Sequence, residues 1–464
     1  MKIKKIFLPA IFALIYSSCA NQLPPSGGED DRTPPEILQT RPKANTLNFK
    51  GNSISFKFNE YVDRRSFEES FNISPLPSGE TIFNWSGKEV EINFSKPFEK
   101  NRTYVVTLNR DLKDLRGGNK ANTSYSFAFS TGSKLDSGKI RGRVYTDKID
   151  RIKILAYLKN RFSPGKIDPV VDIPAFISQP SDDGEYLFTN LPEGNFRLFA
   201  ISDEDRNNLF GKEFELISVL PDDITLNADS LQFEDADFLM KNFGFNKSSK
   251  EFLNSLTSYS EDRIHTNISS GTGKIPGDYK FYFYFKDSNI VKSDIVNNSS
   301  ITDTSTDKSY KLIYNWLNDS LLEIFSLEKF SNSSVINISI DLKETSKKLI
   351  FSEDLNVADR NSTGVISGKL TGDSEILFPV YIILLNNGNK FISYIKKLTD
   401  TKEFRFDDVA EGNYTLFSYI DENENGAFDN GSYFPFSGSE KFFVFGQELK
   451  VKGNWNTDNI FIEF

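Results

Sequence analysis

The side chains best placed to bind a ligand form an acidic run near the C-terminal end, Asp421-Glu-Asn-Glu-Asn-Gly-Ala-Phe-Asp429. Oxygen-bearing side chains occupy loop positions 1, 3, 5 and 9 and glycine occupies position 6, which is the spacing of loops that wrap around Ca²⁺. Position 12 is Ser432 instead of the bidentate glutamate of an EF-hand, so the site would be weak or completed from elsewhere. The alternative is an acidic turn without metal, because Asp and Asn favour turns unaided. The expected ligands are the side chains of Asp421, Asn423, Asn425 and Asp429 and the carbonyl of Ala427.

A second acidic run lies upstream and is the weaker calcium candidate. Asp203, Asp205 and Asn207 have the spacing of the first three ligand positions. Asn208 stands where the sharp turn between ligands favours glycine, and Gly211 stands at the ninth position without a side chain to bind with. Calcium is therefore a candidate ligand at both loops, and no cofactor is expected to be required.

Both acidic runs end copies of one longer pattern. Glu185–Asn207 aligns without a gap with Glu403–Asn425, so the copies are 218 residues apart. Each copy alternates apolar and polar residues, turns at Glu-Gly-Asn and alternates again, which predicts a hairpin with one buried face. We therefore expect two copies of one β-sandwich module, with Gly412 at positive φ in the second turn.

Each repeat begins well before this hairpin. A strand containing Gly-x-Val or Gly-x-Leu starts near Lys139 in one copy and near Val365 in the other, and an apolar strand follows it. The fuller pattern resembles the transthyretin-like or carboxypeptidase-regulatory-like sandwich. That resemblance implies modules at residues 138–211 and 364–464, and Trp455 is expected to cap the second core.

The composition favours an all-β protein. Phe and Tyr are abundant, with 43 and 18 copies, and aromatic side chains suit the half-buried faces of sheets. A chain of 464 residues is too long for one core, so we expect tandem Ig-like and transthyretin-like sandwiches. The net charge of −10 is spread along the chain, which argues against nucleic-acid binding because that requires clustered Lys and Arg.

The single cysteine, Cys19, follows a basic start and an apolar run of ten residues from Ile6 to Ile15. That run is too short to span a bilayer but fits a secretory signal. With the small residues before Cys19, it resembles a bacterial lipoprotein signal, which implies a signal peptide at residues 1–18 and lipidation of Cys19. The alternative is an ordinary signal peptide with an incidental cysteine. The rest of the chain has no cysteine, so no disulfide can form within the mature protein.

Residues 19–32 are rich in Pro, Gly and Ser and predict a flexible tether. The acids Glu29, Asp30 and Asp31 near its end resemble the export signal of surface-displayed lipoproteins, although a merely solvated linker is an equal alternative. Display on the cell surface and on the periplasmic face of the outer membrane therefore both stay open.

Residues 33–132 contain short alternating strands separated by polar turns, which predict one sandwich. Several motifs in this segment occur in the same order as in the S-layer-protein (SbsA-type) Ig-like domain, which the segment resembles. That resemblance implies a structural or adhesive envelope module without catalysis. The motifs that carry it are Pro34-Pro35, Phe56-Phe58-Glu60, Asn101-Thr103-Tyr104-Leu108, Gly118-Asn119 and Phe127-Phe129-Thr131-Gly132.

Residues 212–363 are expected to form a β-rich, Ig-like domain. Lys280–Phe285 is almost solidly aromatic, with three Phe on one strand face and Tyr282 and Tyr284 on the other. The two tyrosines could form a sugar-stacking strip if that sheet face is exposed. Packing against a neighbouring element is the alternative, because aromatic side chains dominate burial in cores.

Catalytic residues are not expected. His265 is the only histidine, which excludes a zinc centre with several histidines, and it is expected at the surface. Adjacent acids such as Asp182-Asp183 and Asp407-Asp408 would point apart or into solvent instead of cooperating in glycoside hydrolysis. The sequence also lacks a glycine-rich phosphate loop between a strand and a helix.

The order of modules resembles envelope lipoproteins of Gram-negative bacteria. The leading hypothesis is a non-enzymatic, lipid-anchored envelope protein that scaffolds the envelope or binds an envelope protein or polysaccharide. One alternative is an accessory glycan- or protein-binding lipoprotein of an outer-membrane uptake system. A hydrolase is the third hypothesis, and it predicts a cleft that holds two acids with perturbed pKa values.

Overall fold

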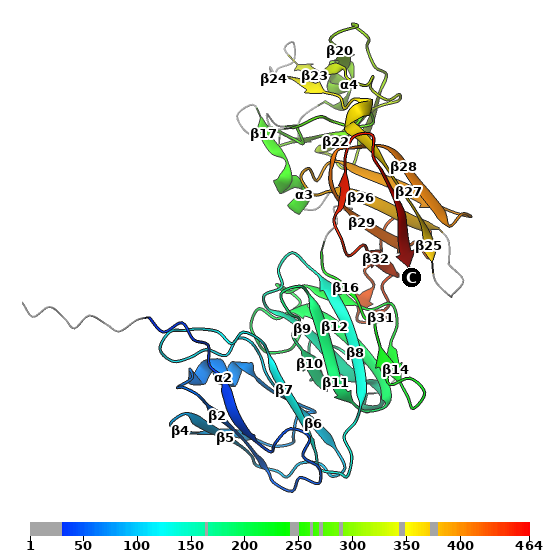
Figure 1. Ribbon diagram of the computed structural model, residues 1–464. Coiled ribbons are helices and arrows are strands. Elements are labelled where there is room, and N and C mark those ends of the chain that lie inside the picture. The colour runs from blue at the N-terminus through cyan, green and yellow to red at the C-terminus, as the bar shows by residue number, and fades with distance from the viewer. Residues whose placement is uncertain are drawn as a thin grey trace, which may run out of the picture. The chain divides into compact units, whose positions relative to one another are not determined.

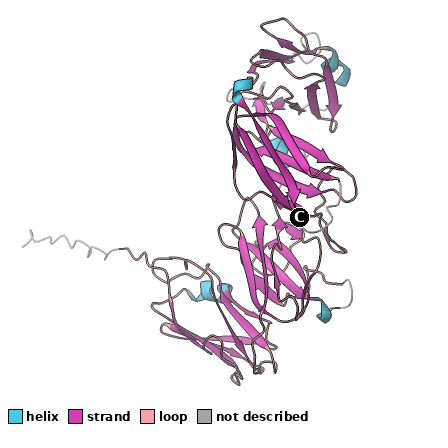
Figure 2. Cartoon of the chain, turned by 45° about the vertical axis from the view of Figure 1, so that its right-hand side comes forward, coloured by secondary structure: helices cyan, strands magenta, loops and turns pink. Residues whose placement is uncertain are grey.

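The alternating patterns form strands throughout the described part of the chain, which confirms the all-β fold class (Figure 2). The computed structural model describes residues 30–162, 166–241, 250–259, 263–268, 272–286, 291–342, 349–371 and 379–464. Cys19, the expected signal peptide and most of the tether lie outside the described residues. Two compact units form, one from residues up to Gly138 plus Thr189–Pro192 and the other from Lys139–Phe188 plus Glu193–Phe464.

The first unit is a sandwich of two antiparallel sheets. Phe67 reaches its core from helix α2 (Arg64–Ser70), whose N-terminus is capped by Asp63, since the Asp63 carboxylate accepts a hydrogen bond from the Ser66 N–H at 2.7 Å. One sheet has the order β1 (Ile37–Arg41), β2 (Ser53–Phe58), β5 (Glu89–Phe94), β4 (Thr81–Ser86), and the other β3 (Phe71–Ser74), β6 (Thr103–Leu108), β7 (Tyr125–Ser130).

The two sequence repeats have the same topology (Figure 1). In the first, β9 and β12 form the centre of one sheet and β8 the centre of the other. The strands are β8 (Gly138–Tyr145), β9 (Ile152–Leu158), β10 (Phe176–Ser178), β11 (Glu185–Leu191), β12 (Gly194–Ser202), β13 (Ile217–Val219), β14 (Ile224–Leu226), β15 (Gln232–Phe233) and β16 (Phe238–Leu239). Since β13 to β16 pair with β12 and β8, the sheets of this repeat continue past the expected end at residue 211 to Leu239.

In the second repeat, β26 and β29 are central in one sheet and β25 in the other. Its last strand runs parallel to β25, as β15 and β16 do to β8. Trp455, just before that strand, is 61% exposed, so the prediction that it caps the core is wrong. The strands are β25 (Thr363–Thr371), β26 (Val380–Asn386), β27 (Ser393–Leu398), β28 (Glu403–Ala410), β29 (Gly412–Ile420), β32 (Phe442–Val444), β33 (Leu449–Val451) and β34 (Asn456–Glu463), with a small extra hairpin of β30 (Ser432–Tyr433) and β31 (Phe436–Ser437).

The Glu-Gly-Asn turns connect the two sheets and do not form hairpins. β28 pairs with β25, whereas β29 pairs with β26, β32 and β33. The hairpin prediction was therefore wrong, because an alternating pattern shows a buried face without showing which strand is the partner. Gly412 has a φ of 155°, so the expected positive φ is confirmed.

The strands between the repeats form two further sheets. One has the order β17 (Thr257–Tyr259), β18 (Ile264–Thr266), β19 (Phe281–Phe285), β22 (Leu321–Ser326), β21 (Leu312–Trp316), and the other β20 (Ser299–Asp303), β23 (Val335–Leu342), β24 (Leu349–Asn356). Short helices α3 (Lys250–Ser255) and α4 (Lys292–Asn297) accompany them. Phe281, Phe283 and Phe285 are buried on one face of β19, as expected.

The other face of β19 does not present a sugar-stacking strip. Tyr282 is 4% exposed, and its hydroxyl donates a hydrogen bond to Glu323 Oε2 at 2.8 Å. The rings of Phe252 and Phe391 contact Tyr282 at centroid distances of 5.2 and 6.4 Å. These contacts cover the tyrosine, which contradicts the exposed-aromatic alternative.

Replacing Gly142 or Gly368 with alanine is expected to destabilise the corresponding repeat. A Cβ on Gly142 would lie 2.0 Å from the carbonyl oxygen of Ala236, and one on Gly368 would lie 2.1 Å from that of Ile460. Backbone atoms cannot move away as a flexible side chain can, so overpacking should lower the free energy of unfolding by about 1–3 kcal/mol or more. Urea denaturation measures this loss. Gly446→Ala, where a Cβ would have no neighbour within 4 Å, is the control and should change stability by less than about 0.5 kcal/mol.

Candidate functional site

Strands β12 and β29 place the two acidic loops at equivalent positions. Each strand ends in a run of buried residues, and the next residue is the first aspartate of the loop. Asp203 is therefore 1% exposed and Asp421 fully buried. A carboxylate held at such a position needs hydrogen-bond donors or a cation around it.

In the upstream loop, three carboxylates approach one another. Single carboxylate oxygens of Asp203, Asp205 and Glu215 lie within 4.8 Å of one another. Asn207, the third expected ligand, lies beside Asp205, since its side-chain nitrogen donates a hydrogen bond to Asp205 Oδ2 at 2.8 Å and its side-chain oxygen accepts one from the Leu209 N–H at 2.6 Å. The structure thus brings Asp203 and Asp205 together and adds Glu215 to them.

Glu215 ties the two ends of the upstream loop together. It is 7% exposed, and its two oxygens accept hydrogen bonds from the N–H groups of Glu204 at 2.7 Å and Gly211 at 2.8 Å. Burial raises the pKa of Asp203 to about 6, and the nearby charges of Glu215 and Asp205 add to that effect. The Asn208 N–H and the Lys153 ammonium act in the opposite direction.

The downstream loop is closed by its own hydrogen bonds. Both oxygens of Asp421 accept backbone N–H groups, from Asn425 at 3.0 Å and from Gly426 at 2.9 Å. The amide nitrogens of Asn423 and Asn425 both donate to Asp429 Oδ2. The five expected ligands therefore lie on one compact loop, and calcium binding by them stays a prediction.

Glu440 plays the same part in the downstream loop that Glu215 plays upstream. It is 5% exposed and accepts hydrogen bonds from the N–H groups of Glu422 at 2.9 Å and Asp429 at 3.0 Å. Burial raises the pKa of Glu440, with further contributions from Asp429 and Asp421. Neither glutamate can be recognised from the repeat alignment, because the β30–β31 hairpin lies between the downstream loop and Glu440 and interrupts that alignment.

A third group of acids lies in the first unit. Single oxygens of Asp31, Glu60 and Asp114 lie within 4.8 Å of one another. Asp114 is satisfied, since it accepts hydrogen bonds from the Gly118 N–H and the Asn119 side chain, both at 2.6 Å. Burial raises the pKa of Glu60, and the charges of Asp31 and Asp114 raise it further. Glu60 and the Gly118-Asn119 turn carried the Ig-like resemblance, but sequence alone did not place them at one site.

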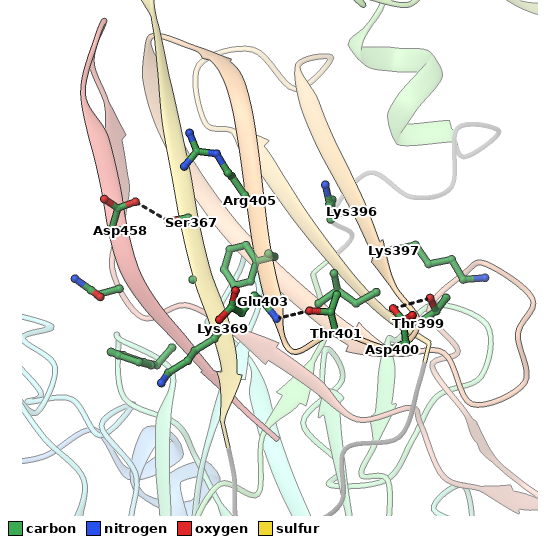
Figure 3. A pocket seen from close by; sticks show the side chains of 15 residues that line it. Ser367, Lys369, Lys396, Lys397, Thr399, Asp400, Thr401, Glu403, Arg405 and Asp458 are labelled. Atoms are coloured by element: carbon green, nitrogen blue, oxygen red, sulfur yellow. Dashed lines mark hydrogen bonds between the residues drawn. The ribbon is translucent and has the colours of Figure 1, made fainter.

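The second repeat also carries a hollow of about 660 Å³, which is lined from β25, β27, β28 and β34 (Figure 3). Its side chains mix both charges, with Lys369, Lys396, Lys397 and Arg405 beside Asp400, Glu403 and Asp458. Ser367 donates a hydrogen bond to Asp458 within it. The hollow therefore offers a polar surface to a ligand.

The residues weighed for catalysis occupy separate surroundings. Asp407 pairs with Arg405 at 2.8 Å and Asp408 with Lys329 at 3.5 Å, so these adjacent acids form surface ion pairs. Asp183 accepts a hydrogen bond from Ser181. His265, which was expected at the surface, is half-buried in β18. Among the described helices, none is long and apolar enough to cross a membrane.

Residues 31–131 match the family described as the bacterial Ig-like domain. This match confirms the Ig-like class expected for that part of the chain, and the two-sheet sandwich of the first unit agrees with it. A search of curated proteins found no match.

Likenesses to solved structures are distant. Domains 1-6 of surface layer protein SbsC share 9% identity over 90% of this chain and 67% of that chain, with a TM-score of 0.18. BcpA, the major pilin subunit of Bacillus cereus, shares 9% identity over 71% of this chain and 99% of that chain, with a TM-score of 0.17. An L,D-transpeptidase from Mycobacterium smegmatis shares 19% identity over 36% of this chain and 60% of that chain, with a TM-score of 0.16. Sequence identities and TM-scores as low as these do not support inferring a function from any of these proteins.

Proposed function

We propose that this protein is a non-enzymatic, lipid-anchored component of the bacterial cell envelope that acts as a structural or partner-binding scaffold. The observation that carries the proposal is the bacterial Ig-like domain at residues 31–131, which follows closely on Cys19. Ig-like sandwiches present surfaces on a rigid frame, and any specific role resides in residues grafted onto that frame. The later sheets continue this design, with aromatic and aliphatic cores.

The anchor would be a lipid on Cys19 in the outer membrane, and the partner an envelope protein or polysaccharide. The tether at residues 19–32 would separate the lipid from the first sandwich. Both the periplasmic face and the cell surface are compatible with that tether.

Cys19→Ala is expected to abolish acylation, because Cys19 is the single cysteine in the sequence and its thiol is the group that would carry the lipid. The measurement is incorporation of radiolabelled palmitate into the immunoprecipitated protein in cells. Ser18→Ala is the matched control and should keep its label, since it leaves the cysteine and a small residue before it. Label that persists in Cys19→Ala would refute the anchor.

The accessory glycan- or protein-binding role is the second candidate, and the mixed-charge hollow around Lys369 and Asp458 favours it. Sugars are held by hydrogen bonds to such polar groups as well as by stacking on aromatic rings. A glycan panel separates the two roles. Specific glycan binding that Lys396→Ala weakens would favour the accessory role over the scaffold.

A further inference from the structure

The loop between β12 and β13 holds a buried carboxylate oxygen without a hydrogen-bond partner. Asp203 is 1% exposed, and its Oδ1 accepts a hydrogen bond from the Asn208 N–H at 3.2 Å. Its Oδ2 is buried and accepts none from the residues that the structure describes. Removing a carboxylate oxygen from water without a donor or cation to replace the water is unfavourable. The hydrogen bonds of the loop therefore leave the negative charge on Asp203 Oδ2 uncompensated.

The neighbouring carboxylates add further negative charge close to Asp203. Single oxygens of Asp203, Asp205 and Glu215 lie within 4.8 Å of one another. Two oxygens that bind one Ca²⁺ at about 2.3–2.6 Å can be separated by at most about 5 Å. The spacing of the three carboxylates thus suits a shared cation.

The described groups that most affect the pKa of Asp203 include one cation and two further carboxylates. Lys153 supplies a positive charge near Asp203, but its effect on the pKa of that carboxyl is smaller than that of burial. One ammonium beside three carboxylates leaves an excess of negative charge. A divalent cation would remove it.

We propose that Asp203, Asp205 and Glu215 bind a calcium ion in the first repeat. The donor set is entirely oxygen, which favours a hard cation over Zn²⁺, a metal usually bound with nitrogen or sulfur ligands. Carboxylates on a loop suit Ca²⁺ better than Mg²⁺, because Mg²⁺ requires near-ideal octahedral geometry and retains its water. Glu215 adds a buried carboxylate to the Asp203 and Asp205 side chains expected from the sequence, and the site is independent of the lipid anchor.

The downstream loop has the same position in its repeat, but both oxygens of its first aspartate accept hydrogen bonds. Asp421 occupies the position of Asp203, and backbone N–H groups pair with both of its oxygens. Asn423 stands in place of Asp205, so that position contributes no charge. The structure thus favours the upstream loop for calcium, which reverses the order expected from the sequence.

The test titrates CaCl₂ into the full mature chain, stripped with EDTA, by isothermal titration calorimetry at pH 7.5. We expect saturable binding by the wild type and at least about a tenfold weaker affinity in Asp205→Asn, because affinity at such sites depends on the number of charged ligands. Asp205 is exposed, so Asp205→Asn should fold. Glu215→Gln is the less suitable variant, because Glu215 also holds the two ends of the loop together through hydrogen bonds.

Two further variants locate the binding event. Asp229→Asn removes the same charge from an exposed turn of the same repeat and should bind like the wild type. Asp429→Asn alters the downstream loop and should keep the event that Asp205→Asn weakens. The proposal is overturned if the wild type gives no binding heat, if Asp205→Asn keeps wild-type affinity, or if MgCl₂ at the same concentrations reproduces the calcium response.

Discussion

Asp223→Ala is expected to lower the free energy of unfolding of the first repeat by about 3–5 kcal/mol, since removing one member of a buried ion pair leaves the other charge uncompensated. Arg197 Nε and Nη2 donate to the two Asp223 oxygens, both at 2.8 Å, and the Arg197 side chain is only 7% exposed. Lys159 also pairs with Asp223. Urea denaturation of the wild type and the variant measures the loss.

The second repeat supplies the matched control. Glu448 stands at the position equivalent to Asp223, but its partner there is the neutral side chain of Asn387, which donates to it at 2.7 Å. Glu448 is exposed, so Glu448→Ala should cost less than about 1 kcal/mol. Equal losses in the two variants would contradict the argument that the buried arginine sets the effect.

The same ion pair predicts a pH dependence. Burial alone would raise the pKa of Asp223, but hydrogen bonds and charge from Arg197 and Lys159 outweigh it, and the pKa falls below its ordinary value of 3.8. A carboxyl with a lowered pKa in the folded state stabilises the protein fully above its unfolded-state pKa. That contribution is lost as pH falls from about 3.8 through the folded-state value. The stability difference between wild type and Asp223→Ala should therefore be constant near neutral pH and shrink below pH 3.8.

Phe67→Ala is expected to cost the first unit about 3–5 kcal/mol, as large-to-small changes of aromatic residues in cores do. Phe67 is fully buried, and its ring lies 5.6 Å from that of Phe56, 5.9 Å from Phe58 and 5.2 Å from Trp85, centroid to centroid. Alanine would leave a cavity among rings held by two sheets, which can close it only in part.

Fluorescence of Trp85 during urea denaturation can follow this unit, with the other tryptophans, Trp316 and Trp455, replaced by Phe. Leu115→Ala is the control in the same unit, because Leu115 is 58% exposed and should contribute less than about 0.5 kcal/mol. A cost for Phe67→Ala as small as that of Leu115→Ala would show that the ring is not part of a packed core.

Alternation along the chain was enough to predict the strands and their buried faces. In β2, Ile54, Phe56 and Phe58 are buried as the pattern indicates. Partners were harder to predict, because β28 and β29 show the same alternation whether they pair with each other or lie in opposite sheets. Alternation reports which face is buried, while hydrogen-bond partners depend on contacts far apart in the sequence.

The candidate site shows the same limit. The loop spacing identified Asp203 and Asp205, which contribute from within one short segment. Glu215 reaches them only because β13 pairs with β12, and this pairing cannot be predicted from the spacing of residues within the loop. The unpaired oxygen of Asp203 is likewise a property of packing, since the equivalent Asp421 has both oxygens paired.

The most direct test of the envelope-scaffold proposal is a pull-down from cross-linked cells, with wild type and Cys19→Ala compared. The proposal predicts that the wild type brings down an envelope protein or polysaccharide from the membrane fraction, and that recovery falls when Cys19 is replaced. A wild type found apart from the membrane fraction, or one that cross-links to no envelope component, would contradict it.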